Sequence, residues 1–323
     1  MSPGSEFLVG IDAGGTHTRV VAADVSGGLC GQGVGGPGNY QLVGGEGLCR
    51  LIVDLVSRLN LDAVPHALCA GVAGAGRAPE QADLRARLLD AGAARSVLVV
   101  SDSRAALEGA FGGDDGIVLI AGTGSIAMGR GPEGRVLRAG GWGPVLGDEG
   151  SAYALVLAGI RAVLGARDGW GERTALEACL LAVLGLRDWD EVVGAVSSGR
   201  LDRERIAAAC PRLFAAAREG DGVAARIIAD GAGCLGRQAA AVARRLGLGP
   251  RVPVACTGGV FAQAEALWPH LEATARVAGI ELVRQPARLP ALFGTLLLAA
   301  GEVGLSLPAA AIAGWVSQSR APS

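Results

Sequence analysis

Two turns rich in glycine and hydroxyl side chains have the composition of phosphate-binding loops. In the first, an apolar segment ends in Asp12 and is followed by two glycines and two threonines, up to Thr18. Backbone N–H groups of such a turn can face a phosphate group, while Asp12 faces a magnesium ion directly or through water. An ordinary hairpin turn also favours aspartate and glycine, so this motif alone leaves both interpretations open.

The second turn is A-G-T-G-S at residues 121–125, which follows another apolar run. Its N–H groups and hydroxyls could contact the opposite side of a polyphosphate. Either turn taken separately could be a simple tight turn. Because both occur at the same place in two similar units, the pair favours two phosphate loops that hold one polyphosphate.

An aspartate lies between the two turns, at the end of a third apolar run. Asp102 follows the strand-like residues 97–100 and precedes a helix-like segment, and open α/β sheets bind ligands at the carboxyl ends of their strands. A carboxylate there can accept the proton of an alcohol that attacks a phosphoryl group. Asp102 could instead cap the helix, although Ser101 and Ser103 could cap it as well.

A further glycine-rich segment combines an indole with two acids. Trp142 lies in G-G-W-G, and Asp148 and Glu149 lie in G-D-E-G before an expected helix. Carboxylates, backbone amides and an indole suit a polyhydroxylated ring such as a sugar. The alternative is that the two acids only stabilise the N-terminus of the helix. Asn39, in the loop G-P-G-N-Y, could contact the same ring or could simply be a turn residue.

Two α/β units are needed to position these motifs. Alternating and apolar runs predict the order βββαβαβα for the first unit. Its expected strands are residues 7–12, 16–24, 29–34, 67–72 and 96–100, and its expected helices include 47–60 and 79–91.

The pattern of three strands restarts after the turn at residues 112–116. This repeat of a hairpin with a glycine loop predicts a second unit of related fold. Its further expected elements are an alanine-rich helical region at 151–246, a strand at 252–256 and helices at 262–278 and 290–304.

The composition excludes several functional classes. A chain of 323 residues favours two lobes, and two lobes imply a cleft. The net charge is −2 and the arginines are scattered, which argues against a nucleic-acid surface. Half of the residues are hydrophobic, but every apolar run is broken well before about 18 residues, so no membrane-spanning helix is expected.

The seven cysteines have no C-x-x-C spacing and no companions that would form a metal-ligand cluster. They are interpreted as small buried hydrophobic residues of a protein in the reducing cytoplasm. Residues 1–6 carry no signal-peptide pattern, and G-S-E-F is typical of a cloning remnant.

Taken together, the motifs resemble those of the N-acetylglucosamine kinases in the BadF-type ATPase group, within the superfamily of actin, hexokinase and the 70-kDa heat-shock chaperones. The resemblance covers about residues 7–304, and its motifs are G-I-D-A-G-G-T-H-T, S-D-S, A-G-T-G-S, G-G-W-G-P-V-L-G-D-E-G-S-A-Y and T-G-G-V. It implies an α/β fold with two actin-like, ribonuclease H-like lobes that face a central cleft, each a five-stranded mixed sheet with helices. We expect an N-terminal lobe at 7–114, completed by a C-terminal helix at 305–319, and a C-terminal lobe at 115–304.

The resemblance implies ATP-dependent phosphorylation of an amino sugar, with Asp102 as the general base. N-acetylglucosamine, phosphorylated at its 6-position, is the first candidate, and glucosamine and N-acetylmuramic acid are alternatives. The residues implied for Mg²⁺ and ATP are Asp12, Gly14, Gly15, Thr16, Thr123, Gly124, Ser125, Ala207, Gly258 and Gly259. The residues implied for the sugar are Asn39, Asp102, Thr123, Gly141, Trp142 and Asp148. Family members are commonly homodimers, so a homodimer is expected.

Two functions of other classes fit the same fold. An ATPase that activates a partner enzyme would need a cysteine that ligates an iron–sulfur cluster at a dimer interface, whereas Cys69 and Cys256 lie within apolar strands. A non-catalytic sugar sensor usually carries a helix-turn-helix before the first strand, which is expected here at residue 7. The sequence therefore favours the kinase.

Overall fold

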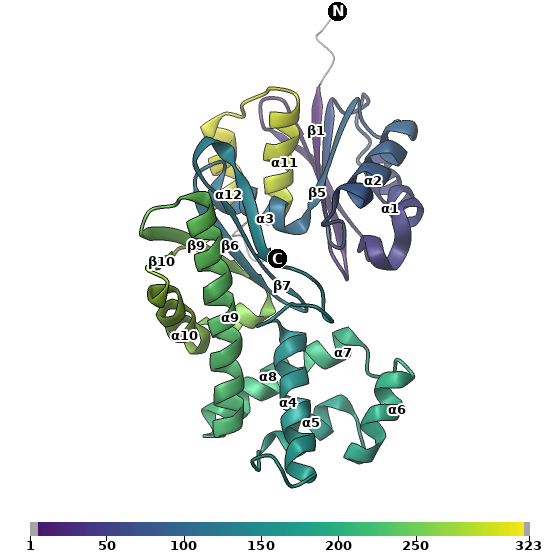
Figure 1. The fold of residues 1–323 in the computed structure, drawn as a ribbon. Helices are drawn as coiled ribbons and strands as arrows, with labels where there is room; N and C mark the ends of the chain where they lie inside the picture. Colours follow the sequence, from purple (N-terminus) through teal and green to yellow (C-terminus); the bar gives the residue numbers. More distant parts are fainter. Residues whose placement is uncertain (1–5, 320–323) are drawn as a thin grey trace, which may run out of the picture. The chain divides into compact units, whose positions relative to one another are not determined.

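The computed structural model describes residues 6–319, which divide into two compact units. Among these residues, unit 1 comprises 6–114 and 286–319, and unit 2 comprises 115–285. Each unit is built around one five-stranded mixed sheet with helices (Figure 1). The predicted α/β fold class is confirmed.

The sheet of unit 1 has the strand order β3-β2-β1-β4-β5. β1, β2 and β3 form an antiparallel meander, and β4 and β5 extend it in parallel with β1. Both faces of β1 are covered, because Val9 and Ile11 belong to one buried cluster and Leu8 to another. The strands are β1 (Phe7–Ala13), β2 (Thr18–Asp24), β3 (Leu29–Gly35), β4 (Ala67–Val72) and β5 (Ser96–Ser101).

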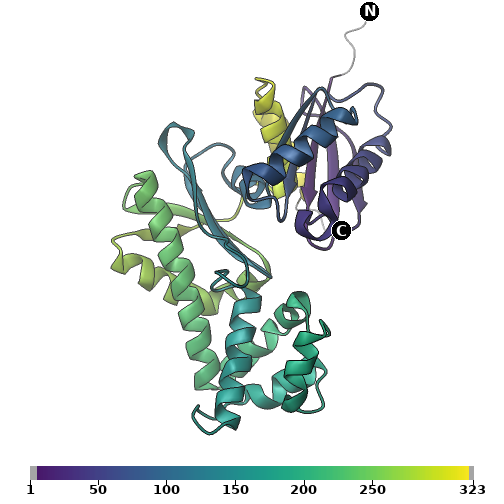
Figure 2. The same cartoon turned by 45° about the vertical axis from the view of Figure 1, so that its right-hand side comes forward.

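Two layers of helices cover this sheet. α1 and α2 lie on one side of it, and α3 and α11 lie on the other, as the two views agree (Figures 1 and 2). α12 joins the second layer, where the Trp315 ring stacks on Phe293 at 5.5 Å between centroids and its Nε1 donates to the Gly27 carbonyl. The helices are α1 (Tyr40–Ser57), α2 (Ala78–Asp90), α3 (Asp102–Phe111), α11 (Ala291–Glu302) and α12 (Ala309–Ser319).

The sheet of unit 2 has the order β10-β9-β6-β7-β8. β6, β7 and β8 form an antiparallel meander, and β9 and β10 run parallel to β6, so the connections repeat those of unit 1. The predicted structural repeat is confirmed. The strands are β6 (Gly116–Ala121), β7 (Ser125–Arg130), β8 (Val136–Gly140), β9 (Arg251–Thr257) and β10 (Glu281–Arg284).

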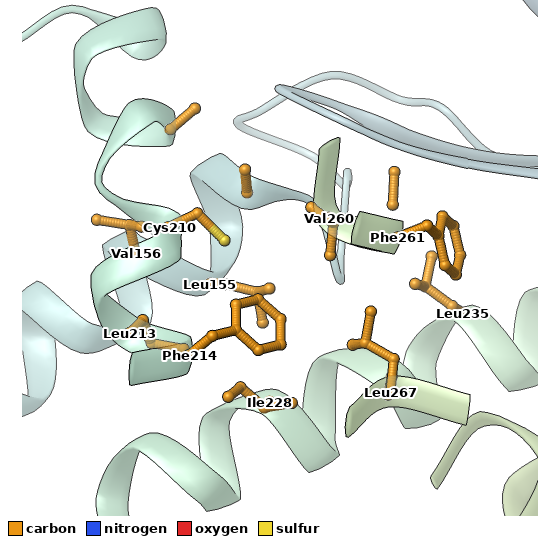
Figure 3. Close-up of a cluster of buried hydrophobic side chains, with 14 of the residues drawn as sticks. Leu155, Val156, Cys210, Leu213, Phe214, Ile228, Leu235, Val260, Phe261 and Leu267 are labelled. Carbon is orange, nitrogen blue, oxygen red and sulfur yellow. The ribbon is translucent and has the colours of Figure 1, made fainter. Parts of the chain in front are cut away.

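Helices form most of the core of unit 2. The long helix α9 packs on β7 and β8 and also contacts α4, α8 and α10. Figure 3 shows how Leu155, Phe214, Ile228 and Leu267 bring four of these helices together around one apolar cluster. The elements are α4 (Ala152–Arg167), α5 (Leu176–Leu184), α6 (Val192–Ser197), α7 (Arg203–Ala208), α8 (Cys210–Arg218), α9 (Gly222–Leu246) and α10 (Ala264–Val277), with 3-10 turns at Pro132–Gly134, Trp189–Glu191 and Gly259–Gln263.

The structure corrects three expectations about element and lobe boundaries. α1 begins at Tyr40 rather than 47, because Asn39 caps a first helical turn; Gly44, with a non-helical φ of 70° and ψ of 165°, forms a kink between that turn and the rest of the helix. β10 has no counterpart among the predicted strands. Residues 286–304 were expected in the C-terminal lobe but belong to unit 1.

Close packing explains why α11 belongs to unit 1. A Cβ atom at Gly10 of β1 would overlap the Thr295 hydroxyl, and one at Gly294 would overlap backbone atoms of α3. Small residues on both sides therefore let the helix approach the sheet and α3 at backbone distance. In the part of the chain from residue 6 to 319, no helix is both long enough and apolar enough to cross a membrane.

Candidate active site

The first phosphate-loop candidate is a tight turn between β1 and β2. The Gly14 N–H donates to the His17 carbonyl at 2.9 Å, and the Gly38 N–H donates to the Gly14 carbonyl at 2.9 Å. Gly15, Thr16 and His17 are exposed, and a Cβ atom at Gly15 would meet no atom within 4 Å. The turn thus presents open backbone, as a loop that receives an anion must.

Asp12 lies at the end of β1 beside this turn. Its Oδ2 accepts a hydrogen bond from Arg19 Nη2 at 2.6 Å, across the antiparallel pairing of β1 and β2. The carboxylate side chain is 13% exposed, whereas that of Arg19 is 53% exposed. Asp12 is therefore held in place by a partner that solvent reaches.

Asp12, Asp102 and Asn39 all lie at one edge of the sheet of unit 1. Ala13 pairs with Val72 and Val72 pairs with Ser101, so the ends of β1, β4 and β5 are in register. The Ala73 N–H donates to the Ala13 carbonyl and the Tyr40 N–H donates to the Ala73 carbonyl, which ties the start of α1 to the same edge. This convergence follows from the parallel strands, whose carboxyl ends meet at one edge.

The cap of α3 is Ser101, not Asp102. Ser101 Oγ accepts from the Arg104 N–H at 3.2 Å, while Asp102 Oδ1 accepts from the Ser103 N–H at 2.7 Å. Asp102 is half-buried, and burial raises the pKa of its carboxyl to about 6, against the lowering effect of the Ser103 N–H; the negative charge of Asp12 raises it further. The Asp102 carboxylate is therefore not used as the helix cap, and it is suited to exchange a proton near neutral pH.

Asn39 does cap its helix. Its Oδ1 accepts from the Gln41 N–H at 2.9 Å, and Gln41 Nε2 donates to the Gly74 carbonyl at 2.9 Å. The side-chain oxygen of Asn39 is thus used for this structural role, as the turn-residue interpretation predicts. The cap occupies only one side of the amide group, whose nitrogen is a donor by nature.

The second phosphate-loop candidate joins β6 to β7 in unit 2. The Gly122 N–H donates to the Gly124 carbonyl at 2.9 Å, and the Ala152 N–H donates to the Gly122 carbonyl at 2.8 Å. Gly258, in T-G-G-V, has φ 102°, and a Cβ atom there would lie 2.6 Å from the Ala121 carbonyl carbon. The T-G-G-V motif, implied to bind ATP, and the second loop are thus in backbone contact within unit 2.

The glycine-rich sugar-loop candidate, residues 140–150, packs against this second loop. Ser125 Oγ donates to the Glu149 carbonyl at 2.7 Å. Trp142 is 57% exposed, and the Arg138 guanidinium lies 4.8 Å from the centre of its ring. Arg138 Nη1 also donates to the carbonyls of Gly140 and Gly141 at 3.0 Å each, so one arginine orients both the backbone and the indole.

Asp148 is 4% exposed and is the most enclosed acid of the sugar-loop candidate. Its backbone is in the left-handed region at φ 61°, which aspartate tolerates better than most residues. Oδ1 accepts from the Gly143 N–H at 3.3 Å, and Oδ2 accepts from Arg203 Nη2 at 2.6 Å. Burial raises the pKa of Asp148, and the charge of Arg203 opposes that rise.

A serine again supplies the helix cap at this loop. Ser151 Oγ accepts from the Ala154 N–H at 3.2 Å at the start of α4. Neither Asp148 nor Glu149 fills that role, so of the structural alternative for the two acids only an interaction with the helix dipole is left. Glu149 is instead bound through Oε2 by Gln238 of α9 at 3.2 Å.

Unit 1 thus gathers the predicted residues Asp12, Gly14, Gly15, Thr16, Asn39 and Asp102 at one sheet edge, and unit 2 gathers Thr123, Gly124, Ser125, Gly141, Trp142, Asp148, Gly258 and Gly259 around one loop. Ala207 lies on α7 and is buried in the apolar core of unit 2 at 7% exposure. Arg19, which binds Asp12 in unit 1, was not predicted, and neither were three polar side chains in contact with the sugar-loop candidate of unit 2: Arg138, Arg203 and Gln238. No motif in the sequence marks them; Arg203 and Gln238 contact the loop from α7 and α9, and Arg138 lies outside the glycine-rich motif, on β8.

Comparisons with known proteins show which proteins the chain resembles. The chain is 30% identical over 263 residues to the N-acetylmuramic acid/N-acetylglucosamine kinase of Clostridium acetobutylicum, covering 79% of this chain and 86% of that protein. It is 31% identical over 271 residues to the N-acetyl-D-glucosamine kinase of Dictyostelium discoideum, covering 79% and 85%. A crystal structure from Chromobacterium violaceum, of a protein assigned to the N-acetylglucosamine kinases, matches with a TM-score of 0.71 and 27% identity over 92% of this chain and all of that one.

A family model matches most of the chain as well. It is that of the BadF/BadG/BcrA/BcrD ATPase family, and it spans residues 9–291, which contain both phosphate-loop candidates, Asp102 and the sugar-loop candidate. The chain therefore belongs to the BadF/BadG/BcrA/BcrD ATPase family.

Proposed function

We propose that the protein is an ATP-dependent kinase that phosphorylates a hydroxyl group of an amino sugar. The observation that carries this proposal is the half-buried Asp102, whose carboxylate is free of the helix cap and has a pKa of about 6. The names of the Clostridium and Dictyostelium relatives support the same reaction and substrate class.

The residues of unit 1 fit a magnesium–nucleotide complex. Mg²⁺ in phosphoryl-transfer sites commonly uses one or two carboxylates with water and phosphate oxygens, and Asp12 offers such a carboxylate beside the open turn at Gly15. We propose that Asp12 would hold Mg²⁺, directly or through water, while Gly14, Gly15 and Thr16 would contact phosphate. When bound, Mg²⁺–ATP supplies the phosphoryl group and neutralises part of its charge.

Unit 2 offers a second set of contacts for the two substrates. We assign Thr123, Gly124 and Ser125 to phosphate, and Gly258, Gly259 and Ala207 to adenosine. The sugar is assigned to Asn39, Thr123, Gly141, Trp142 and Asp148, with Asp102 as the base that removes the proton of the attacking hydroxyl. An acid with two fixed donors, such as Asp148, suits recognition of adjacent hydroxyl groups.

N-acetylglucosamine is the proposed substrate, because both relatives named above carry that sugar in their names. The 6-hydroxyl is the proposed acceptor, as the family resemblance implies. N-acetylmuramic acid and glucosamine are the alternatives, the first from the Clostridium relative and the second from a glucosamine kinase of Vibrio cholerae that is 32% identical over 53% of this chain. We further propose a homodimer, as expected from the family resemblance, that acts in the cytoplasm, as expected from the cysteine pattern.

The release of ADP in the presence of a sugar panel tests the proposed function. The panel contains N-acetylglucosamine, glucosamine, N-acetylmannosamine, N-acetylmuramic acid, glucose and a blank without sugar. We expect turnover with an N-acetylated amino sugar at a rate at least about tenfold above the blank, since a productive acceptor positions its hydroxyl better than water. Equal ADP release in all six arms would contradict a sugar kinase and would favour an ATPase.

The pH dependence of kcat/KM is expected to follow the ionisation of Asp102. A base works in its ionised form, and the pKa of Asp102 is about 6, so kcat/KM should fall about tenfold per pH unit below that value and level off above it. Initial rates from pH 5 to 8.5 at constant ionic strength measure this limb. A rate that stays constant down to pH 5 would contradict the assignment of the base.

A further inference from the structure

Arg203 connects the two glycine-rich loops of unit 2, although it lies 55 residues from Asp148 in the sequence. It is the first residue of α7, whose cap is Asp202. Its Nη2 donates to Asp148 Oδ2 at 2.6 Å. A Cβ atom at Gly124 would lie 2.6 Å from this Nη2 and 2.8 Å from Asp148 Oδ2. The ion pair therefore rests directly on the backbone of the second phosphate-loop candidate.

In this ion pair, the Asp148 side chain is enclosed and the Arg203 side chain is partly accessible to solvent. The Asp148 side chain is 5% exposed and that of Arg203 is 36% exposed. Within residues 6–319, Arg203 Nε is buried and has no hydrogen-bond partner. A buried N–H without an acceptor is costly, so the enclosed part of the Arg203 guanidinium is held there by its ion pair and not by a hydrogen bond of its Nε.

The surroundings of Asp148 raise its pKa, and the charge of Arg203 counteracts that effect. Burial raises the pKa of Asp148 most strongly, and the neighbouring Glu149 raises it as well. The charge of Arg203 lowers it, as do the N–H groups of Ser125 and Gly143. Of the other polar side chains on this loop, Arg138 lies over Trp142 and Gln238 binds Glu149. Arg203 is thus the cation in direct contact with the acid.

We propose that Arg203 is a positioning residue for sugar recognition: it keeps the Asp148 carboxylate charged and directs its free lone pairs towards the hydroxyls of the sugar. This inference rests on the proposed function, which assigns Asp148 to the sugar. Arg203 acts through Asp148, so its loss should affect sugar affinity far more than the chemical step. A protonated Asp148 would carry an O–H donor in place of one acceptor. It would then accept fewer hydrogen bonds from the hydroxyls of the sugar.

The first test measures the titration of Asp148 without any substrate. Protein with aspartate labelled by ¹³C at the side-chain carboxyl gives an Asp148 signal that is identified by its loss in Asp148→Asn. We expect Arg203→Met, which keeps an apolar stem but removes the charge, to move the titration midpoint upward by about one pH unit or more. Arg203→Lys should restore most of the wild-type value. An unmoved midpoint in Arg203→Met would overturn the proposal.

The second test follows the sugar KM of each variant with N-acetylglucosamine from pH 6 to 8.5. For Arg203→Met we expect a KM raised about 10- to 100-fold at pH 6 that recovers towards pH 8.5, with kcat within about threefold of wild type. The matched control is Arg205→Met, which removes an exposed arginine on the same helix and should leave KM unchanged. A raised KM that is independent of pH, or a loss confined to kcat, would contradict a positioning role.

A double variant guards against simple misfolding. Asp148→Asn/Arg203→Met leaves no buried charge unpaired, so it should fold even where Arg203→Met is unstable. Its KM should equal that of Asp148→Asn at every pH, because Arg203 has no separate effect once Asp148 is gone; a further increase would overturn the proposal. If the wild type phosphorylates no sugar, the proposed function fails, and the titration alone then decides whether Arg203 controls Asp148.

Discussion

Asp102→Asn is expected to lower kcat by about 100- to 10,000-fold, the range typical of a lost general base, while sugar and ATP affinities change little. Asparagine keeps the shape and can still accept from the Ser103 N–H, so the fold and the start of α3 are preserved. Coupled measurement of ADP release at pH 7.5 gives kcat and both KM values. Asp62→Asn, at an exposed position of the same unit, is the control and should retain full activity.

The same substitution is expected to stabilise the protein. Because the folded-state pKa of Asp102 is raised, its ionisation opposes folding as the pH rises through about 6, and the protonated acid below pH 4 carries no such cost. Asn cannot ionise, so it should raise the free energy of unfolding by about 1–3 kcal/mol at pH 7.5, with the gain shrinking towards pH 4. Near-wild-type turnover together with unchanged stability would refute both the assigned role and its electrostatic basis.

Gly258→Ala is expected to destabilise the protein by about 3 kcal/mol or more. A side chain at this position would overlap the backbone of Ala121, and its φ of 102° is one that alanine rarely adopts. Because backbone atoms cannot move aside as a flexible side chain can, β9 and the second phosphate-loop candidate would have to separate. Urea unfolding followed by circular dichroism measures the loss, and activity at 25 °C should fall with it.

Two other glycines of unit 2, Gly249 and Gly259, serve as controls for the Gly258 substitution. Gly249→Ala, in the same unit, introduces a methyl group with no atom within 4 Å and should change the unfolding free energy by less than about 0.5 kcal/mol. Gly259→Ala also meets open space, so it should fold normally but raise the KM for ATP if the residue lies against adenosine. Equal stability of all three variants would mean that the contact between Gly258 and Ala121 is not a constraint.

The strands that carry the candidate residues were predictable because they are apolar on both faces. Each of β1, β4 and β5 is covered by helices on both sides, so its sequence is a short hydrophobic run with a polar residue at its end, and that residue is Asp12 or Asp102 in two of the three cases. β10 was not predicted, because it lacks such a hydrophobic run. It is a four-residue edge strand, E-L-V-R, with a charge at each end, and its pairing with β9 compensates for its weak pattern.

The contacts between elements were beyond sequence reasoning. The aspartate in G-D-E-G could be singled out by its motif, but nothing in the letters around Arg203 indicates that it reaches Asp148, because an ion pair between separate elements leaves no periodic signal. The same holds for α11. Its apolar pattern predicts a helix, whereas its place against β1 and α3 depends on glycines on both partners. The type and the ends of a helix or strand depend on its local sequence. Which other elements it packs against depends on how closely their side chains fit together.

The division of unit 1 between the two ends of the chain affects the order in which the protein folds during synthesis. β1 and β4 leave the ribosome early, but α11 and α12, which cover one of their faces, are made last. Unit 2 is continuous in sequence and can collapse while the nascent chain is still growing. The early strands must wait with Leu8, Val21 and Cys69 uncovered, so chaperone demand should be greatest in that interval, and truncation near residue 290 should yield an aggregating product.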